Sequence, residues 1–444
     1  MQTVIVGAGP TGLYTGIALA RRGHSVTVVD RDPGPQDQDS WERKGVMQFH
    51  HPHGFRGQVV EALQVEMPDV FDSLMAAGAV PTVFPEMPDR VIGIKCRRMV
   101  FERVLRTAAT REPGVELRTG HVAAVCEDGG RAVGVLVGGQ RLAADLVLDA
   151  SGRGGRLSEG RRAPAESGDC GISYVSRQYE LLPGATEGPV NSPIGLGETY
   201  PGYQVYVFVH DNRTFSALIT RDSADTSLGQ LRDQRAFEAA CPEIPGLAAW
   251  TGPERARPIT PVLPGGRLRN SHRGQLDADG RVALPGMVFV GDAVCTTNPT
   301  AGRGIATGLL QAQRLLGLLD DLAPDFAAVS LSFHSWCEAN IRPWFDDHVY
   351  WDADLTRRWS GGDIDLTKRL PSDLILTAAE ADRSLMPVVG PYLGMHALPD
   401  SLLAVEPRAK EIYAAGWRPP VPDGPTRDGL AELVLRALAP TSAR

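Results

Sequence analysis

Residues 3–30, TVIVGAGPTGLYTGIALARRGHSVTVVD, are the stretch that decides the fold. Thr3–Val6 is a short apolar, β-branched run typical of a buried strand. Thr11–Arg22 has apolar residues at helical spacing and is followed by Gly23, a residue that suits the C′ position of a helix. Val26–Val29 indicates a second buried strand. The order strand, glycine turn, helix, strand predicts one half of a doubly wound, Rossmann-like α/β domain.

The glycine turn has the spacing of a dinucleotide-binding fingerprint. Gly7 permits the tight turn, Gly9 lets the backbone approach a pyrophosphate, and Gly12 lets helix and strand pack closely. Asp30 ends the second strand, where a carboxylate can accept hydrogen bonds from ribose hydroxyls. The alternative is a purely structural turn, and the fingerprint alone does not separate NAD from FAD. The cofactor-binding residues predicted from this segment are Gly7, Gly9, Pro10, Thr11, Gly12, Asp30 and Arg31.

A second glycine-rich segment lies far along the chain. The run 282–290 predicts a buried strand, and it leads into Gly291-Asp292 and then into PTAGRGI at 299–305, where a helix is expected to start at Gly304. Backbone N–H groups at a helix N-terminus stabilise an anion such as reduced flavin. The alternative is a glycine turn that only joins strand to helix.

With both segments in view, the chain resembles the FAD-dependent hydroxylases related to p-hydroxybenzoate hydroxylase, including the styrene monooxygenase and polyether epoxidase branches. The resemblance implies that Asp292 binds the ribityl chain and that the helix after 299–304 points at the flavin pyrimidine ring. The cofactor-binding residues that it implies here are Gly291, Asp292, Pro299, Gly302, Gly304 and Ile305.

Four further positions match the same family. Arg43 resembles the arginine that meets the FAD pyrophosphate, and Val46 lies where the backbone meets the flavin ring. Arg98 resembles the arginine of a helix beside the cofactor, and Val122 lies where the backbone reads adenine. Each could equally be an ordinary surface arginine or core valine.

The sequence departs from the family at one motif. The family usually has Asp-Gly where this chain has Ser151-Gly152, and that aspartate serves both FAD and NADPH. NAD(P)H is therefore expected as the reductant either directly or through a separate flavin reductase. Two-component relatives such as flavin-dependent halogenases share this feature. However, the chain has no WxWxIP segment, and neither Lys44 nor Lys95 has the setting of a halogenase lysine.

These patterns predict four segments along the chain. Residues 1–160 and 281–327 form a discontinuous FAD-binding domain, 161–280 an antiparallel-sheet substrate domain, and 328–444 a helical C-terminal region. The middle sheet is expected from runs at 171–182 and 203–220.

Candidates for contact with the substrate are weaker. Arg177 could hold an anionic group, although a surface arginine beside core aromatics is the slightly favoured alternative. Tyr206 lies on a neighbouring predicted strand. His53 is a candidate proton donor, but no catalytic residue is assigned. A metal site built on His50, His51 and His53 would need a fourth ligand, so no metal is expected.

Composition excludes several classes. The net charge is −8, which does not suit a nucleic-acid binder, and no apolar run is long enough for a membrane span. The six cysteines are scattered without a CxxC pair, and the first strand leaves no room for a signal peptide, so a cytoplasmic location is expected. The oligomeric state stays open.

The function predicted is an FAD-dependent monooxygenase. The resemblance implies that it uses O2, through a flavin hydroperoxide, to hydroxylate or epoxidise a small organic substrate, as in secondary metabolism. The first alternative is an FAD-dependent dehydrogenase or oxidase on the same fold. The second is a flavin-binding protein without turnover. One fold hosts many chemistries, so the fold does not decide between them.

Overall fold

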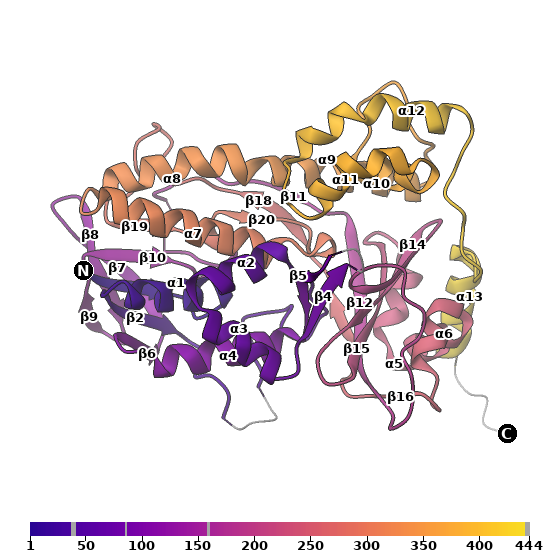
Figure 1. Cartoon of the computed structure of the whole chain (residues 1–444), viewed down its shortest axis with the longest axis horizontal. Helices are drawn as coiled ribbons and strands as arrows, with labels where there is room; N and C mark the ends of the chain where they lie inside the picture. The colour runs from indigo at the N-terminus through magenta and orange to yellow at the C-terminus, as the bar shows by residue number, and fades with distance from the viewer. Residues whose placement is uncertain (37–40, 85–86, 158–159, 440–444) are drawn as a thin grey trace.

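The computed structural model describes residues 1–36, 41–84, 87–157 and 160–439, arranged in three connected parts (Figure 1). A nucleotide-binding part contains the N-terminus, a second part contains the largest antiparallel sheet, and a group of helices lies above both. This is the α/β architecture expected from the sequence. The domain boundaries at 160, 280 and 327 stay predictions.

A five-stranded parallel sheet forms the nucleotide-binding part. Its strand order is β19-β10-β1-β2-β6, and β1 pairs in register with β2 on one side and β10 on the other. The fifth strand comes from residues 287–289, far from the rest in sequence, so this part is discontinuous as predicted. The strands are β1 (Gln2–Val6), β2 (Ser25–Asp30), β6 (Val115–Thr119), β10 (Leu146–Asp149) and β19 (Met287–Phe289).

Helices pack around this sheet because their apolar faces are buried in one shared core. Helix α1 contacts both α4 and α7, and α7 contacts α8. The helices are α1 (Pro10–Arg21), α2 (Gly57–Glu66), α3 (Pro68–Ala76), α4 (Arg98–Arg111), α7 (Gly304–Leu322) and α8 (Phe326–Asn340). Small sheets complete this part of the fold; they contain β3 (Phe55–Arg56), β4 (Val80–Phe84), β5 (Met87–Lys95), β7 (Val122–Asp128), β8 (Arg131–Val137), β9 (Gln140–Ala143), β11 (Glu166–Asp169), β18 (Arg269–His272) and β20 (Cys295–Thr296).

The second part is an antiparallel sheet with the order β13-β14-β15-β12-β16, to which β17 is attached. Its two faces differ. One face, with Val175 and Tyr179, packs on α5, α6 and α13, and the other, with Tyr174 and Leu218, packs against α9. The elements are β12 (Ile172–Leu181), β13 (Gly195–Tyr200), β14 (Tyr203–Val209), β15 (Thr214–Asp222), β16 (Ala256–Pro258), β17 (Leu263–Gly265), α5 (Gln234–Ala240) and α6 (Pro245–Thr251).

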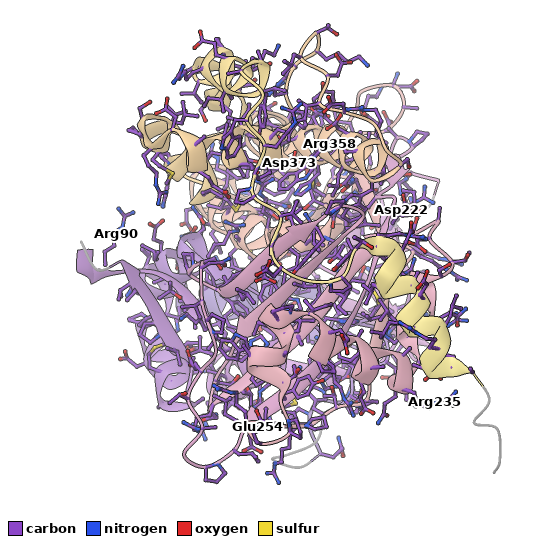
Figure 2. The ribbon with its side chains drawn as sticks, turned by 90° about the vertical axis from the view of Figure 1, so that its right-hand side faces the viewer. Arg90, Asp222, Arg235, Glu254, Arg358 and Asp373 are labelled. Carbon is purple, nitrogen blue, oxygen red and sulfur yellow. The ribbon has the colours of Figure 1, made fainter. Side chains whose placement is uncertain are left out.

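The C-terminal region is mainly helical, with two features the sequence patterns did not predict. The aromatic segment 336–359 is not one helix, because α8 ends at Asn340 and α9 (Arg342–Trp359) begins beyond Ile341. Helices α10 (Ser372–Ala381), α11 (Met386–Leu393) and α12 (Glu406–Ala414) follow, and α13 (Arg427–Leu438) then returns to pack on α5 of the middle sheet (Figure 2).

Other expected elements are shorter in the structure. The strand expected over 282–290 is limited to Met287–Phe289. The segment before α6 contains the short 3-10 turn Leu228–Arg232, followed by α5. Within the described part of the chain, no helix is long and apolar enough to cross a membrane.

Candidate active site

The three fingerprint glycines have different surroundings. A Cβ atom on Gly12 would lie 1.9 Å from the carbonyl oxygen of Gly7, and one on Gly7 would lie 2.4 Å from the carbonyl oxygen of Ala150. Both positions are closed by backbone, so glycine is needed for packing. A Cβ on Gly9 would meet no atom within 4 Å. The open position is the one at which the fingerprint requires space for a pyrophosphate.

Helix α1 begins beside this opening. Pro10 occupies its first turn, and Thr11 follows. The Thr11 side chain faces the second glycine segment, because Cβ atoms on Gly291 and Gly308 would lie 3.1 and 2.4 Å from its hydroxyl. The two predicted cofactor segments are thus packed against each other, through contacts between Thr11 and glycine.

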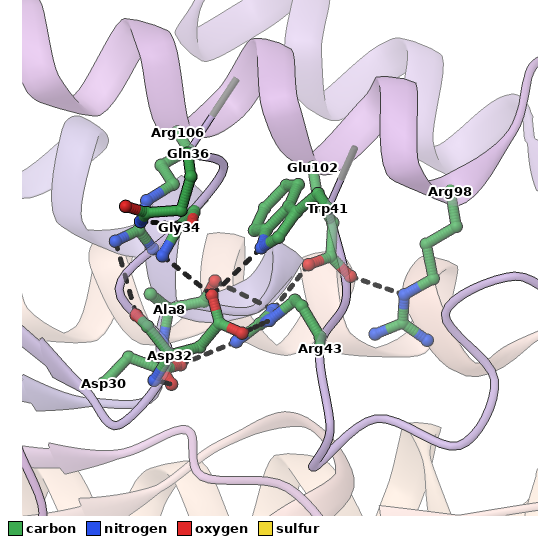
Figure 3. Close-up of polar contacts among 10 residues, drawn as sticks. All are labelled: Ala8, Asp30, Asp32, Gly34, Gln36, Trp41, Arg43, Arg98, Glu102 and Arg106. Carbon is green, nitrogen blue, oxygen red and sulfur yellow. Dashed lines mark hydrogen bonds and ion pairs between the residues drawn. The ribbon is translucent and has the colours of Figure 1, made fainter. Parts of the chain in front are cut away.

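Asp30 and Arg43 belong to a network of charges beside the glycine turn (Figure 3). Arg43 donates to Asp30 at 2.7 Å, to Glu102 at 2.5 Å and to the carbonyl oxygen of Ala8 at 3.2 Å. Asp30 also accepts from the Ala8 N–H at 2.7 Å. Glu102, fully buried, accepts from Arg98 as well. Most donors of Arg43 are therefore used within the protein, but its Nε has no hydrogen-bond acceptor among the described residues.

The remaining positions expected near the adenosine and flavin lie around the same turn. The Arg31 guanidinium lies over Gly45, where a Cβ would come within 2.1 Å of it. Val46 is half-buried and its N–H donates to the Arg43 carbonyl oxygen. Val122 is buried at the start of β7, shortly after Gly120, whose N–H donates to the Asp30 carbonyl oxygen at 2.8 Å.

Asp292 lies beside the start of α7. The nearest atom to a Cβ on Gly304 would be Oδ1 of Asp292, at 3.9 Å, and Gly302 has a left-handed backbone with φ of 63°. Asp292 is exposed to solvent, yet the surrounding protein raises the pKa of its carboxyl, an effect that Arg98 and Arg153 oppose. A carboxyl that is accessible yet surrounded by protein is expected where a side chain lines a ligand-binding site.

Two neighbours complete this segment. Pro299 begins the 3-10 turn Pro299–Ala301 that leads into α7. Ile305, in the first turn of α7, is partly buried against the main core. The turn therefore presents backbone, with small side chains, toward the open space.

These observations fit FAD. Gly9 offers space beside a helix N-terminus for a pyrophosphate, and Gly302 and Gly304 offer it for a ring beside the N-terminus of α7. Asp292 is available for ribityl hydroxyls, and Asp30 lies where the ribose is expected.

Ser151 is exposed, but its side chain is bonded to a neighbouring acid. Its hydroxyl donates to Asp149 at 2.5 Å and its N–H donates to the same oxygen at 3.0 Å. Asp149 is buried, and burial raises the pKa of its carboxyl. Ser151 therefore stabilises the buried acid Asp149 at the end of β10. The related hydroxylases usually have an aspartate in place of Ser151.

One face of the middle sheet meets the segment around the histidines. His51 Nδ1 lies 2.7 Å from the Ser176 hydroxyl, and the Gln178 amide donates to the His50 carbonyl oxygen at 2.6 Å. Tyr174 and Tyr206 share this face. Burial lowers the pKa of His51 to about 4 and raises those of both tyrosines to about 12, so these side chains are neutral near pH 7.

His53 is held at both ring nitrogens. Nδ1 lies 2.9 Å from the His51 carbonyl oxygen, and Nε2 lies 3.3 Å from the Arg98 guanidinium. Burial, followed by the charge of Arg98, holds the pKa of His53 well below its usual value. A neutral imidazole that donates to a carbonyl and accepts from arginine has no free N–H, which does not favour the proton-donor role.

The surroundings of Arg177 do not favour a substrate-binding role and agree better with the alternative of an arginine beside core aromatics. Arg177 and Tyr179 do point the same way, but toward α5, on the face opposite Tyr174. Its guanidinium donates to Glu238 of α5 at 2.5 Å and to the Thr260 carbonyl oxygen at 2.8 Å. The alternation along β12 showed which residues share a face but not which face meets the flavin-binding part.

Sequence reasoning missed a set of polar residues around the turn before α7, all buried except the partly exposed Arg56: Arg56, Asn270, Asn298, Arg303, Asp347, Asp352 and Tyr392. Acids on a helix next to aromatic residues were a weak signal for Asp347 and Asp352. Nothing in the sequence pairs them with the turn.

Comparisons with known proteins agree with this geometry. The family model described as "FAD dependent oxidoreductase" matches residues 2–86, and that described as "Tryptophan halogenase" matches residues 94–166. Protein Rv3254 of Mycobacterium tuberculosis is 27% identical over 363 residues, which cover 71% of this chain and 72% of that protein. The 6-hydroxy-3-succinoylpyridine 3-monooxygenase HspB of Pseudomonas putida is 24% identical over 358 residues, which cover 73% of this chain and 80% of that protein.

Among solved structures, a triple mutant of the flavin-dependent brominase Bmp2 superposes with a TM-score of 0.64. It is 17% identical, and the match covers 93% of this chain and 99% of that one. The chain is therefore an FAD-dependent oxidoreductase. More particularly, it has the fold of the FAD-dependent monooxygenase superfamily, so the resemblance inferred from the sequence is confirmed.

Proposed function

We propose that the protein is a monooxygenase that uses FAD and O2 to add one oxygen atom to a small organic substrate. One observation carries the proposal: the open start of α7 meets an uncharged part of the middle sheet. A Cβ on Gly302 would lie 3.9 Å from the Gly54 carbonyl oxygen, and one on Gly54 would lie 3.6 Å from Ile194, just before β13. A substrate between these elements would lie beside the flavin ring.

The residues have separable roles. Gly9, Asp30, Asp292 and the turn 299–304 would hold FAD, which when reduced and bound supplies electrons and activates oxygen. The middle sheet would orient the substrate and exclude water from it.

Two histidines and two tyrosines of this face, His51, His210, Tyr174 and Tyr206, are uncharged near pH 7. Burial lowers the pKa of His210 to about 4, as it does for His51, and Tyr174 and Tyr206 stay protonated. An imidazole with so low a pKa is a weak base, and a protonated tyrosine is not a base at all near pH 7. The chemistry that fits best is therefore oxygenation without deprotonation of the substrate, such as epoxidation of an alkene, ahead of base-assisted hydroxylation of a phenol.

The source of electrons is a separate part of the proposal. Because the Ser151 hydroxyl is bonded to Asp149, and serine lacks the carboxylate that serves NADPH in the family, we propose that a flavin reductase reduces the cofactor with NAD(P)H. Anaerobic mixing with NADPH, and then with NADH, tests this. Bleaching of the bound flavin within seconds would show direct reduction and contradict the reductase proposal.

The test of the oxygenation itself is product mass. The protein, chemically reduced FAD and ¹⁸O-labelled O2 are incubated with candidate alkene and aromatic substrates of the kind found in secondary metabolism, with bromide present. Gain of one labelled oxygen supports a monooxygenase. Loss of two hydrogens would indicate a dehydrogenase or oxidase, and gain of bromine a halogenase. Bound FAD without any product would favour a non-catalytic role.

A further inference from the structure

The N-terminal end of the turn before α7 is hydrogen-bonded to α9. We call residues 298–303 the α7 turn. The Asn298 side-chain amide donates to Asp352 at 2.7 Å, and its backbone N–H donates to the Asn270 side-chain oxygen at 2.7 Å. The Asn270 amide donates in turn to the other oxygen of Asp352, also at 2.7 Å. All three side chains are buried, so this closed triangle joins the turn, β18 and α9.

The second end of the α7 turn is tied to α9 and α11. Arg303 donates to Asp347 at 3.1 Å and to the Tyr392 hydroxyl at 2.5 Å, and that hydroxyl donates to Asp347 at 2.7 Å. The guanidinium also lies over the rings of Trp344 and Tyr392, at 4.5 and 4.9 Å. Arg303 and Asp347 are both almost fully buried, so removal of either leaves a buried charge without its partner.

The middle of the α7 turn is held by Arg56. Its guanidinium donates to the carbonyl oxygens of Ala301 and Gly302 in the turn and to that of Leu393 at the end of α11. These bonds use carbonyl groups and so leave the backbone N–H groups at the start of α7 available. Arg56 has no salt-bridge partner in the described part of the chain.

We propose that helices α9 and α11 are part of the cofactor site, with Asp347, Asp352 and Arg56 as positioning residues that fix the α7 turn against the flavin ring. The inference rests on the proposed function, because the turn has this role only if FAD binds beside it. The C-terminal helical region then does more than cover the molecule. It sets the shape of a backbone surface that includes threonine, alanine and glycine at 300–302, small residues with little means of holding the turn rigid.

Two adjacent acids on α9 supply a matched pair of variants. Asp347→Asn removes the charge that holds Arg303, whereas Asp346→Asn makes the same change one residue earlier, on a half-exposed side chain that pairs with Arg342 at 3.6 Å. If Asp347→Asn does not fold, the double variant Arg303→Met with Asp347→Leu removes both charges and leaves neither unpaired.

The measurements are the dissociation constant for FAD, from quenching of flavin fluorescence, and hydrogen exchange of the amides at 299–307. We expect Asp347→Asn, or the double variant, to weaken FAD binding at least tenfold and to speed exchange in this segment while the parallel sheet stays protected. Asp346→Asn should match the wild type in both. Equal affinity and equal exchange in the two variants would overturn the inference. Failure of the wild type to bind FAD would instead overturn the proposed function, and this inference with it.

Discussion

Alanine substitutions at Gly12 and at Gly9 are expected to damage different properties of the protein. A Cβ added at Gly12 would lie 1.9 Å from the carbonyl oxygen of Gly7 and 3.4 Å from the Ala150 Cβ. A backbone atom cannot move aside without shifting β1 or α1, and overpacking of this kind costs about 1–3 kcal/mol. Gly12→Ala should therefore lower the free energy of unfolding by about 3 kcal/mol, at the upper end of that range, measured by urea denaturation of the FAD-free protein.

Gly9→Ala should leave that free energy almost unchanged. Gly9 has φ of −81° and ψ of 179°, which alanine also adopts, and its Cβ would meet nothing within 4 Å. Loss of the glycine N-cap and the lower entropy of the unfolded chain oppose each other, so the net change is below about 1 kcal/mol. The methyl group would, however, fill the space expected for the pyrophosphate. We expect FAD to bind about 100-fold more weakly, which corresponds to about 2.7 kcal/mol.

Gly317→Ala is the control, because Gly317 lies within α7 and its Cβ would also meet nothing within 4 Å. It should raise the free energy of unfolding by roughly 0.5–1 kcal/mol and leave FAD affinity unchanged. The reasoning is refuted if Gly9→Ala binds FAD as tightly as the wild type, or if it destabilises the FAD-free protein as much as Gly12→Ala does.

Three further changes test individual side chains. Arg177→Met should lower the free energy of unfolding by only about 1 kcal/mol, because its partner Glu238 is half-exposed. The variant should keep the kcat and KM of the wild type, and a fall in kcat alone would instead support a role for Arg177 at the substrate. Burial raises the pKa of Asp352 to about 6, compared with roughly 3.9 in the unfolded chain. The protonated carboxyl therefore contributes fully to the free energy of unfolding below about pH 4. About 3 kcal/mol of that free energy is lost as the pH rises to about 6. Asp352→Asn should remove this slope from urea-derived stability measured against pH, and an unaltered slope would show that another group causes it. His53→Gln should leave the pH profile of kcat/KM unchanged above about pH 6, because His53 is already neutral there; loss of an ionisation near pH 6.5 would contradict this.

The parts of the site that the sequence predicted are those whose residues lie close together in the chain, within one strand–turn–helix unit. Gly7, Gly9 and Gly12 lie within one strand–turn–helix unit, and their spacing is meaningful without knowledge of the rest of the chain. The same holds for Asp292 and the turn before α7. The resemblance to flavoprotein hydroxylases supplied the link between the two segments.

The errors come from choices that only tertiary packing makes. Alternation along β12 gives two faces, and the position of α5 decides that Arg177 lies on the far one. The break between α8 and α9 had a local signal, since Pro343 occupies the first turn of α9. Aromatic residues on both sides of the break, however, suggested a continuous helix. Asp347, the partner of Arg303, lies 44 residues along the chain, and Asp352, the partner of Asn298, lies 54 residues along it. No period in the sequence reveals such separations.

The return of α13 to the middle sheet has a consequence for synthesis on the ribosome. Leu430, Ala431 and Val434 are buried in the same core as Phe237 of α5 and Phe215 of β15. That core lacks part of its apolar covering until residues 427–438 have left the exit tunnel, by which time the rest of the described chain has already emerged. Until then the middle sheet exposes apolar surface, which a chaperone would be expected to cover.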